Sequence, residues 1–340
     1  MHSRPPRPER AIPRWGVFTM VGVGAFFVVT VVVAASAFVV DWTHQVTATA
    51  PAVGTVIVAP EESKAALALP GLTEGTDDYA ATAYLAAQPT AYWLTPEIDP
   101  LGEVGARTES LIAQARAEGL SVAMVVYGLP ERDCGAGLSA GGLDPAGYSE
   151  WTQQIGDALA GAPDVMKIVI VEPDALALGP ECGNTDARMI ELRMAITNLA
   201  STNTWLYVDG GHSDWLAASQ MAELINQLGM NDIIRGFATN VSNYNQTYDE
   251  FEYAHALSEA TGGLHAVIDT SRNGAGSNGE WCNPPGRLVG DPGGTYGDDV
   301  VDTNFWIKPP GESDGTCNGG PTAGAWWPEA AVELTRTVLP

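Results

Sequence analysis

Basic residues are scarce in this 340-residue chain: 16 Lys and Arg stand against 41 Asp and Glu, which gives a formal net charge of −25. Affinity for the phosphate backbone of nucleic acids comes from Lys and Arg, so this balance excludes a nucleic-acid partner. A strongly acidic surface favours solubility and a neutral or cationic ligand. The chemical class of the ligand has to come from the motifs.

Histidine and cysteine are also few, with five His and four Cys. No two cysteines have the close C-x₂₋₄-C spacing of zinc ligands, and there is no His-rich ligand set. A metal-dependent hydrolase that uses an Asp cluster is therefore a weakly supported alternative. An even number of cysteines in an exported chain favours disulfides, but three pairings stay open and free buried thiols are the alternative. The four are Cys134, Cys182, Cys282 and Cys317.

The N-terminal 40 residues differ from the rest of the chain. Residues 1–16 hold four Arg and one Glu, and residues 17–40 contain no charged residue. A spanning helix needs roughly 20 apolar residues, and the Arg-rich flank predicts a basic cytoplasmic tail with the acidic bulk exported. The long apolar run slightly favours a retained signal anchor over a signal peptide cleaved near Ala35-Ser36-Ala37. Export follows from both interpretations.

Residues 41–65 are rich in Thr, Ala, Val and Pro, which predicts a short linker without a core of its own. Residues 66–340 contain no repeat and no second domain such as a carbohydrate-binding module. We therefore expect one folded domain over residues 66–340.

Within this domain, apolar and β-branched runs alternate with helical patterns. Strands that alternate with helices predict βαβ units and a parallel sheet. Six or seven such units favour a TIM-like α/β barrel, complete or incomplete, over an open doubly wound sheet. No G-x-G-x-x-G follows the first strand, so a dinucleotide-binding version has little support. The predicted strands are 91–94, 122–127, 165–171, 205–208, 233–238, 266–268 and 305–307, and the predicted helices are 108–119, 149–161, 186–199 and 219–229.

Polar and aromatic residues follow six of the predicted strands, at the face where α/β barrels carry their active sites. Sugar rings pack on indoles, while their hydroxyls need amides and carboxylates as partners. Cleaving a glycosidic bond needs a protonated carboxyl beside an ionised one. The candidate carboxyls are Asp133, Asp174, Asp209 and Asp314.

Each candidate also has a structural interpretation. A lone Asp after a strand most often caps a helix or forms a turn. Glu172 could be a strand-end salt-bridge partner, and Arg272 and Lys308 could be solvated surface charges. Polar and aromatic residues follow six strand ends in the same way, and this recurrence favours one shared site over six unrelated caps or turns.

Seven segments in order resemble glycoside hydrolase family 6, whose members are endoglucanases and cellobiohydrolases acting on β-1,4-glucan. The resemblance covers roughly residues 80–340 and implies a distorted, seven-stranded α/β barrel. The matching segments are Val126–Gly135, Ile170–Asp174, Val208–His212, Ala238–Tyr244, Val267–Gly274, Glu280–Cys282 and Trp306–Gly315.

The resemblance also assigns expected roles. Asp174 resembles the general acid, and Asp133 resembles the neighbour that keeps the pKa of this acid high. Asp314 resembles the proposed base, and Asp209 a supporting carboxylate. Tyr127 and Ser139 resemble the residues that distort the reacting sugar and position the water. The expected sugar-binding residues are Trp93, His212, Trp215, Asn243, Trp281, Lys308 and Glu312.

The resemblance further implies disulfides Cys134–Cys182 and Cys282–Cys317, and an inverting reaction without metal or other cofactor. Inversion requires the two working carboxyls to lie about 6.5–9.5 Å apart.

Residues 66–340 leave little room for the loop insertions that form tunnels, so we expect an endo-acting monomer on β-1,4-glucan. An exo-acting cellobiohydrolase and a non-catalytic glucan-binding protein are the alternatives.

Overall fold

The computed structural model describes residues 48–339, which belong to one compact unit. The predicted tail at 1–16, the apolar segment at 17–40 and the start of the predicted linker lie outside the described residues. In the part of the chain that the structure describes, no helix has the length and apolar character needed to cross a membrane.

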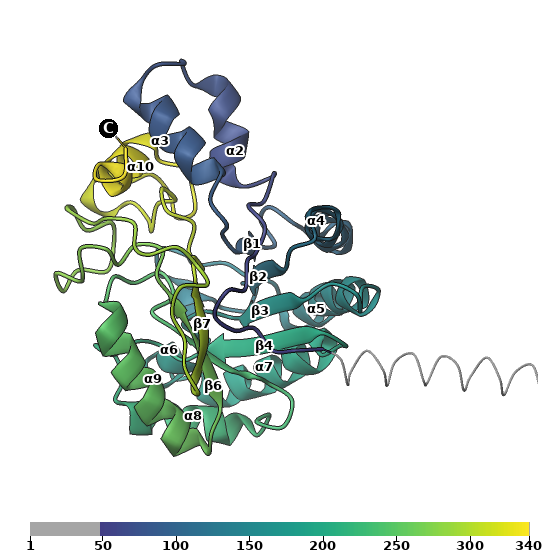
Figure 1. The fold of residues 1–340 in the computed structure, drawn as a ribbon. Helices are drawn as coiled ribbons and strands as arrows, with labels where there is room; N and C mark the ends of the chain where they lie inside the picture. The colour runs from purple at the N-terminus through teal and green to yellow at the C-terminus, as the bar shows by residue number, and fades with distance from the viewer. Residues whose placement is uncertain (1–47, 340) are drawn as a thin grey trace, which may run out of the picture. The chain divides into compact units, whose positions relative to one another are not determined.

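Seven parallel strands form one sheet, in the same order in space as in the sequence. The sheet curls until the segment before the first strand meets the segment after the last, where Ala91 N donates to Trp306 O at 2.9 Å. This arrangement confirms the predicted distorted barrel (Figure 1). The strands are β1 Tyr92–Leu94, β2 Val122–Val126, β3 Lys167–Val171, β4 Thr204–Asp209, β5 Gly236–Thr239, β6 His265–Asp269 and β7 Val301–Phe305.

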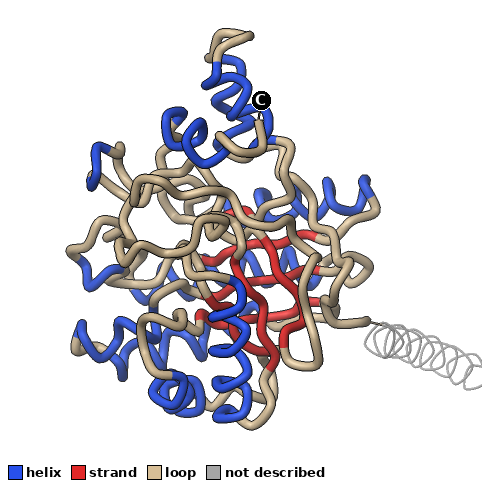
Figure 2. Tube along the Cα trace, turned by 60° about the vertical axis from the view of Figure 1, so that its left-hand side comes forward, coloured by secondary structure: helices blue, strands red, loops and turns tan. Residues whose placement is uncertain are grey.

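The helices lie outside the curled sheet, as the tube view shows with helices in blue around strands in red (Figure 2). Central strands such as β2 and β3 are therefore buried at every position and consist almost wholly of apolar residues. The helices that follow the strands are α4 Val104–Glu118, α5 Pro145–Ala160, α6 Ala175–Cys182, α7 Thr185–Leu199, α8 Ala218–Leu228 and α9 Thr247–Thr261.

Several predicted element boundaries were wrong: α4 begins at Val104 rather than at 108, and β5 begins at Gly236 rather than at 233. Helix α5 begins before Ser149 because Asp144 accepts from Gly147 N at 2.8 Å and Pro145 fits the first turn, although it ends before Gly161 as predicted. Strand β7 precedes most of the predicted 305–307 run, because its polar residues are buried and paired. Asn304, for example, donates to Thr270 Oγ1 at 2.8 Å.

The predicted linker is also wrong for its described part. Ile57 and Val58 are 2% and 1% exposed, and Val58 N donates to Ser121 O at 2.9 Å, so this segment packs beside the sheet. Helix α2 (Lys64–Ala68) then begins inside the predicted linker and leads through η1 (Leu69–Gly71) to α3 (Asp77–Ala86). Helix α3 packs against the C-terminal α10 (Pro328–Thr335), seen together at the top of Figure 1.

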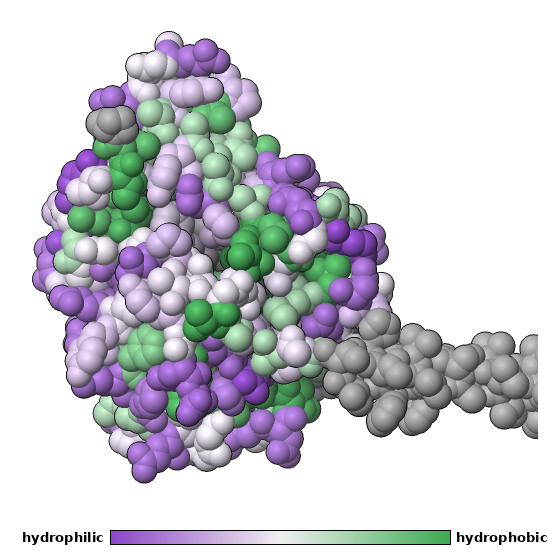
Figure 3. All heavy atoms as spheres, viewed as in Figure 1, coloured by the Kyte–Doolittle hydropathy of each residue, from purple (hydrophilic) through white to green (hydrophobic). Residues whose placement is uncertain are grey.

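On the face drawn in Figure 3, apolar residues form several separate patches between polar ones. Such scattered apolar residues are normal for a protein surface. The apolar side chains that stabilise the fold lie instead between the sheet and its helices and between α3 and α10.

Candidate active site

Asp174 lies just beyond β3, where the backbone turns sharply from strand to helix. Glu172 and Asp174 both adopt left-handed conformations, with φ of 48° and 68°. Residues other than glycine are rarely found there, and such strain clusters at functional sites. Asp174 N donates to Oδ2 of Asp209, at the end of β4, at 2.9 Å. This bond joins two of the predicted catalytic carboxyls.

The surroundings of Asp174 favour its protonated form. Desolvation raises its pKa well above the ordinary value, and the charges of Asp209, Asp133 and Asp314 raise it further. The positive charge of Lys308 acts in the opposite direction. Burial also raises the pKa of Asp209 to about 7, against hydrogen bonds from the backbone of Asp174 and Gly211. As a pair, these two adjacent carboxyls therefore release their protons at a higher pH than two ordinary aspartates do.

Asp133 lies in the loop that leaves β2, in the short helix η2 (Asp133–Gly135). Its Oδ2 accepts from Ser139 N at 2.8 Å, which brings two predicted catalytic residues together. The next residue forms the disulfide Cys134–Cys182 with the last residue of α6. The predicted pairing is confirmed, and it ties the Asp133 loop to the helix that follows Asp174.

Arg132, whose role sequence reasoning missed, organises the same loop. Its guanidinium donates to Tyr127 O and to Ser139 O, each at 2.7 Å, and pairs with Glu97 at 2.9 Å. It also lies 4.4 Å from the centroid of the Tyr127 ring. One sign of this role was visible in the sequence: Arg132 stands directly before the candidate carboxyl of Asp133.

Glu172 is not the salt-bridge partner that one interpretation predicted. It is buried and accepts from Gly128 N at 2.9 Å and from Leu129 N at 3.2 Å. Burial raises its pKa to about 7 in spite of these bonds. Glu172 therefore fixes the backbone that follows Tyr127.

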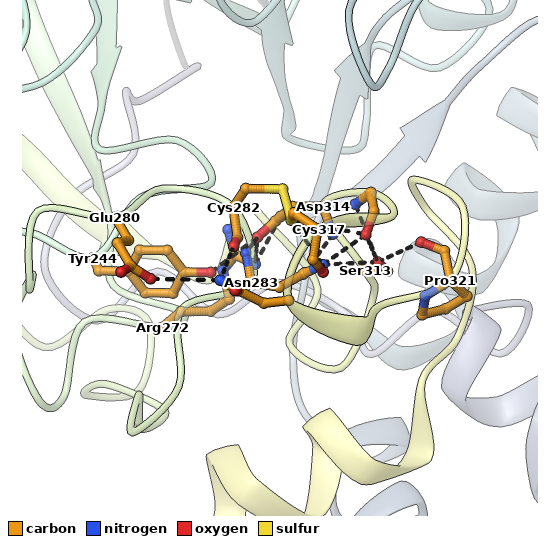
Figure 4. Close-up of a disulfide and its surroundings, with 11 residues drawn as sticks. Tyr244, Arg272, Glu280, Cys282, Asn283, Ser313, Asp314, Cys317 and Pro321 are labelled. Carbon is orange, nitrogen blue, oxygen red and sulfur yellow. Dashed lines mark hydrogen bonds and ion pairs between the residues drawn. A yellow bond between two sulfur atoms is a disulfide. The ribbon is translucent and has the colours of Figure 1, made fainter.

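On the other side of the site, Asp314 is surrounded by hydrogen-bond donors (Figure 4). Arg272 Nη1 lies 2.9 Å from Oδ1 and 3.0 Å from Oδ2. Oδ2 also accepts from Tyr244 OH at 3.0 Å and from Asn283 N at 3.1 Å. Arg272 is only 2% exposed, so its interpretation as a solvated surface charge is wrong.

The second disulfide, Cys282–Cys317, lies beside this cluster and is also confirmed (Figure 4). It joins the residue before Asn283 to the short helix η3 (Cys317–Gly319). Asn283 Nδ2 donates to Gly315 O at 2.7 Å and to Cys317 O at 3.1 Å. Both disulfides therefore lie next to loops that carry predicted catalytic carboxyls.

Lys308 and Trp93 lie together near the junction of β1 and β7. Lys308 Nζ is 5.1 Å from the centroid of the Trp93 ring, and the Trp93 ring meets the Tyr127 ring edge-on at 5.2 Å. Lys308 is 7% exposed, so it is not a solvated surface charge either. Burial lowers its pKa, while Glu312 and Asp314 oppose this effect. Glu312 in turn pairs with Lys64 of α2 at 3.1 Å, a residue that sequence reasoning placed in a linker.

The remaining predicted sugar-binding residues follow β4, β5 and β6. The His212 ring lies 5.7 Å from the Trp215 ring, and Nδ1 is 2.9 Å from Asn245 Nδ2. Asn243 donates to Val241 O at 3.0 Å, and Trp281 is 59% exposed. Asn245 was not predicted, although it follows β5 in the same way as Asn243.

The loop that carries Ser139 reaches the loop that carries Asp314. Gly315 lies so close to Leu138 that a Cβ at this glycine would be 2.8 Å from Leu138 Cδ1. The carboxyl-bearing loops after β2 and β7 are therefore in contact, while those after β3 and β4 meet through Asp174 and Asp209. Among the described residues no group of three or more His, Cys, Asp and Glu is arranged to hold a metal ion.

A parallel α/β barrel with one carboxyl kept protonated and another paired with a cation at the same face has the features of a glycoside hydrolase. The chain belongs to the glycosyl hydrolases family 6, whose model matches residues 52–338. The expected family is thereby confirmed.

The relatives include endoglucanases and cellobiohydrolases. Endoglucanase A of Cellulomonas fimi is 41% identical over 74% of this chain and 55% of its own length. A probable 1,4-β-D-glucan cellobiohydrolase C of Aspergillus niger is 30% identical over 81% of this chain and 74% of its own. The chain thus spans about half the length of the first of these relatives.

Solved structures show the same fold. The endoglucanase Cel6 of Mycobacterium tuberculosis, in complex with methyl-cellobiosyl-4-deoxy-4-thio-β-D-cellobioside, is 35% identical with a TM-score of 0.78, over 85% of this chain and 99% of that one. The catalytic core of the cellobiohydrolase Cel6A of Chaetomium thermophilum is 27% identical with a TM-score of 0.72, over 83% and 96%.

Proposed function

We propose that this protein hydrolyses β-1,4-glucosidic bonds in cellulose or a related β-glucan, with inversion, and that Asp174 is the general acid. The observation that carries the proposal is the place of Asp174 among other carboxyls: its backbone N donates to Asp209 Oδ2 at 2.9 Å, and desolvation and the charges of Asp209, Asp133 and Asp314 raise its pKa. A general acid must be protonated when the substrate binds and must lose its proton in the transition state. Asp174 meets the first requirement.

Asp133 and Asp209 are proposed to sustain this protonation, because their charges raise the pKa of Asp174. Tyr127 and Ser139 are proposed to distort the reacting sugar and to position the attacking water. Arg132 supports both proposals, since it binds the backbone of each residue.

Asp314 is proposed as the base. Three of its four hydrogen-bond contacts fall on Oδ2, and a carboxylate oxygen has two lone-pair sites. Oδ1, with one contact, is therefore the oxygen with capacity for the proton of the attacking water.

The substrate is proposed to bind through indole platforms and polar side chains around these carboxyls. Flat indoles suit the C–H faces of glucose rings, and buried amides, carboxylates and a lysine suit its hydroxyls. The proposed sugar-binding residues are Trp93, His212, Trp215, Asn243, Trp281, Lys308 and Glu312.

We infer an endo mode of attack. Support comes from the endoglucanases of Cellulomonas fimi, at 41% identity, and Mycobacterium tuberculosis, whose chain is covered over 99% of its length. The cellobiohydrolase relatives favour the exo alternative. An endo enzyme lowers the viscosity of carboxymethylcellulose long before reducing ends accumulate, whereas an exo enzyme releases cellobiose with little change in viscosity.

The catalytic proposal is tested by following cellopentaose by proton NMR at early times with the full chain and its Asp174→Asn variant. Asp186→Asn, at the first turn of α7, is a matched control for the chemical change. Fresh α-anomer with the wild type and the control but not with Asp174→Asn is expected. Fresh β-anomer would contradict inversion, and binding without cleavage would favour a glucan-binding protein.

Activity is expected to survive a chelator, because the proposed mechanism uses no metal.

We also propose export and a monomeric state, with the N-terminal segment either retained in the membrane or cleaved. Two disulfides support an oxidising compartment. Cell fractionation with an antibody against the barrel tests the location, and recovery from the cytoplasm would contradict it.

A further inference from the structure

A cavity of about 320 Å³ lies between the Asn283–Arg287 loop and the C-terminal helix α10. Sites for small ligands occupy about 300–1,000 Å³, so the cavity is at the lower end of that range. It is lined from the Asp314 side by Tyr244 and Arg272, which Figure 4 shows together with Asn283. From the other side it is lined by Trp327, Ala330 and Glu333.

The lining residues have the chemistry of a carbohydrate site. Their charges cancel, because Arg272 and Arg287 face Glu312 and Glu333. The arginines also have partners of their own: Arg272 binds Asp314, and Arg287 donates to backbone carbonyls including that of Pro285. The cavity therefore offers no free cation to an anion, but it combines an indole with amide, carboxylate and guanidinium groups. These suit the C–H faces and the hydroxyls of a neutral sugar.

The walls are held in place before any ligand binds. Gly286 N donates to Glu333 Oε1 at 2.5 Å, and Val289 N donates to Leu334 O at 3.0 Å. The disulfide Cys282–Cys317 fixes the start of the same loop. A preformed pocket loses less conformational entropy on binding, which favours affinity.

We propose that this cavity is a second saccharide site, which binds a glucosyl residue of a cello-oligosaccharide outside the cleft that contains Asp174. The proposal rests on the proposed function, because the ligand is of the same class as the substrate. Of the lining residues, Glu312 belongs to the proposed sugar-binding set, and Tyr244 and Arg272 bind the proposed base Asp314. The two sites therefore adjoin through these three residues.

The test uses the full chain carrying Asp174→Asn, which prevents turnover, with ¹⁵N-labelled tryptophan and cellotriose as the probe. The indole signals of Trp327 and Trp93 report on the cavity and the cleft, and single Trp→Phe variants assign them. Ala330→Phe fills the cavity without removing a polar contact, and Ala330→Ser is its matched control.

We expect cellotriose to shift both indole signals with different saturation curves. Ala330→Phe should abolish the Trp327 shift and leave the Trp93 shift, which also shows that the variant is folded, while Ala330→Ser should keep both. A Trp327 signal that stays in place while Trp93 saturates would overturn the second site. So would a Trp327 shift that persists in Ala330→Phe and follows the Trp93 curve. If neither signal moves, the proposed function fails as well.

Discussion

Asp174 and Asp314 lie at the same face of the barrel, yet their surroundings differ. Asp174 has carboxyls as neighbours and is desolvated, with Asp209 accepting from its backbone. Asp314 has donors as neighbours, with Arg272 across both oxygens and Tyr244 and Asn283 on Oδ2. One carboxyl is pushed toward its protonated form, and the charge of the other is directly compensated.

This difference shows how one face can supply both an acid and a base. Two residues of the same type can act as acid and base when their surroundings shift the two carboxyl pKa values apart. In the proposed assignment of Asp174 as acid and Asp314 as base, the difference comes from the loops that carry their partners. The loops after β2, β3 and β4 supply carboxyls to Asp174, whereas those after β5 and β6 supply Tyr244 and Arg272 to Asp314. The following predictions probe each half of the comparison.

The largest effect is expected from Asp174→Asn. General acid catalysis contributes about 10²- to 10⁴-fold, so kcat on cellopentaose should fall by about that factor. A 2,4-dinitrophenyl cellobioside needs no protonation of its leaving group and should be cleaved by the variant with a much smaller loss. Equal losses on both substrates would mean that Asp174 is not the acid.

The second prediction concerns the ion pair between Arg272 and Asp314, which Arg272→Met removes. Breaking a buried ion pair leaves an uncompensated charge, so the free energy of unfolding should fall by about 3–5 kcal/mol in a denaturant titration. Adding Asp314→Asn to this variant should recover a large part of the loss, because no buried charge is then left unpaired. An Arg272→Met variant as stable as the wild type would show that the charge of Asp314 is not balanced by this contact.

Burial near Asp174 also predicts a pH dependence of stability. The pKa of Glu172 is about 7 in the folded protein and near 4.5 in an ordinary Glu. The folded state therefore holds the proton more tightly, and this contribution is complete below pH 4.5 and lost as the pH rises through about 7. The loss is on the order of 3 kcal/mol. Glu172→Gln should flatten the measured dependence, and an unchanged slope would contradict the assignment.

The smallest effect is expected from Asp133→Asn. Removing one neighbouring negative charge should lower the pKa of Asp174, so the alkaline limb of the kcat/KM profile should move to lower pH. Asp186→Asn should leave this limb in place. A limb that stays fixed in Asp133→Asn would show that Asp133 acts on something other than this pKa.

Much of the barrel could be predicted from sequence, because buried parallel strands are nearly continuous apolar runs. Strands β2 and β3 were predicted within two residues of their observed bounds. Strand β7 was displaced, since its buried Asp302 and Asn304 are satisfied by residues from distant parts of the chain. Sequence periodicity carries no information on such long-range partners.

Long-range partners also limited what the sequence could predict about the candidate active site. The candidate carboxyls could be predicted because they follow strands and match family motifs. The positions of Arg272 and Lys64 could not, because an Arg or Lys in a loop resembles a surface residue until its acidic partner is known. Arg272 pairs with Asp314 across 42 positions, and Lys64 with Glu312 across 248.

The central claim, that Asp174 holds its proton at a pH where ordinary aspartates are ionised, is tested most directly by NMR titration of its side-chain carboxyl carbon. The full chain labelled with ¹³C at the Asp carboxyl is titrated, and Asp174→Asn assigns the signal. We predict a midpoint well above the ordinary value near 4, with a displaced midpoint for Asp209 as well. A midpoint at or below 4 would contradict the account, whatever substrate the enzyme cleaves.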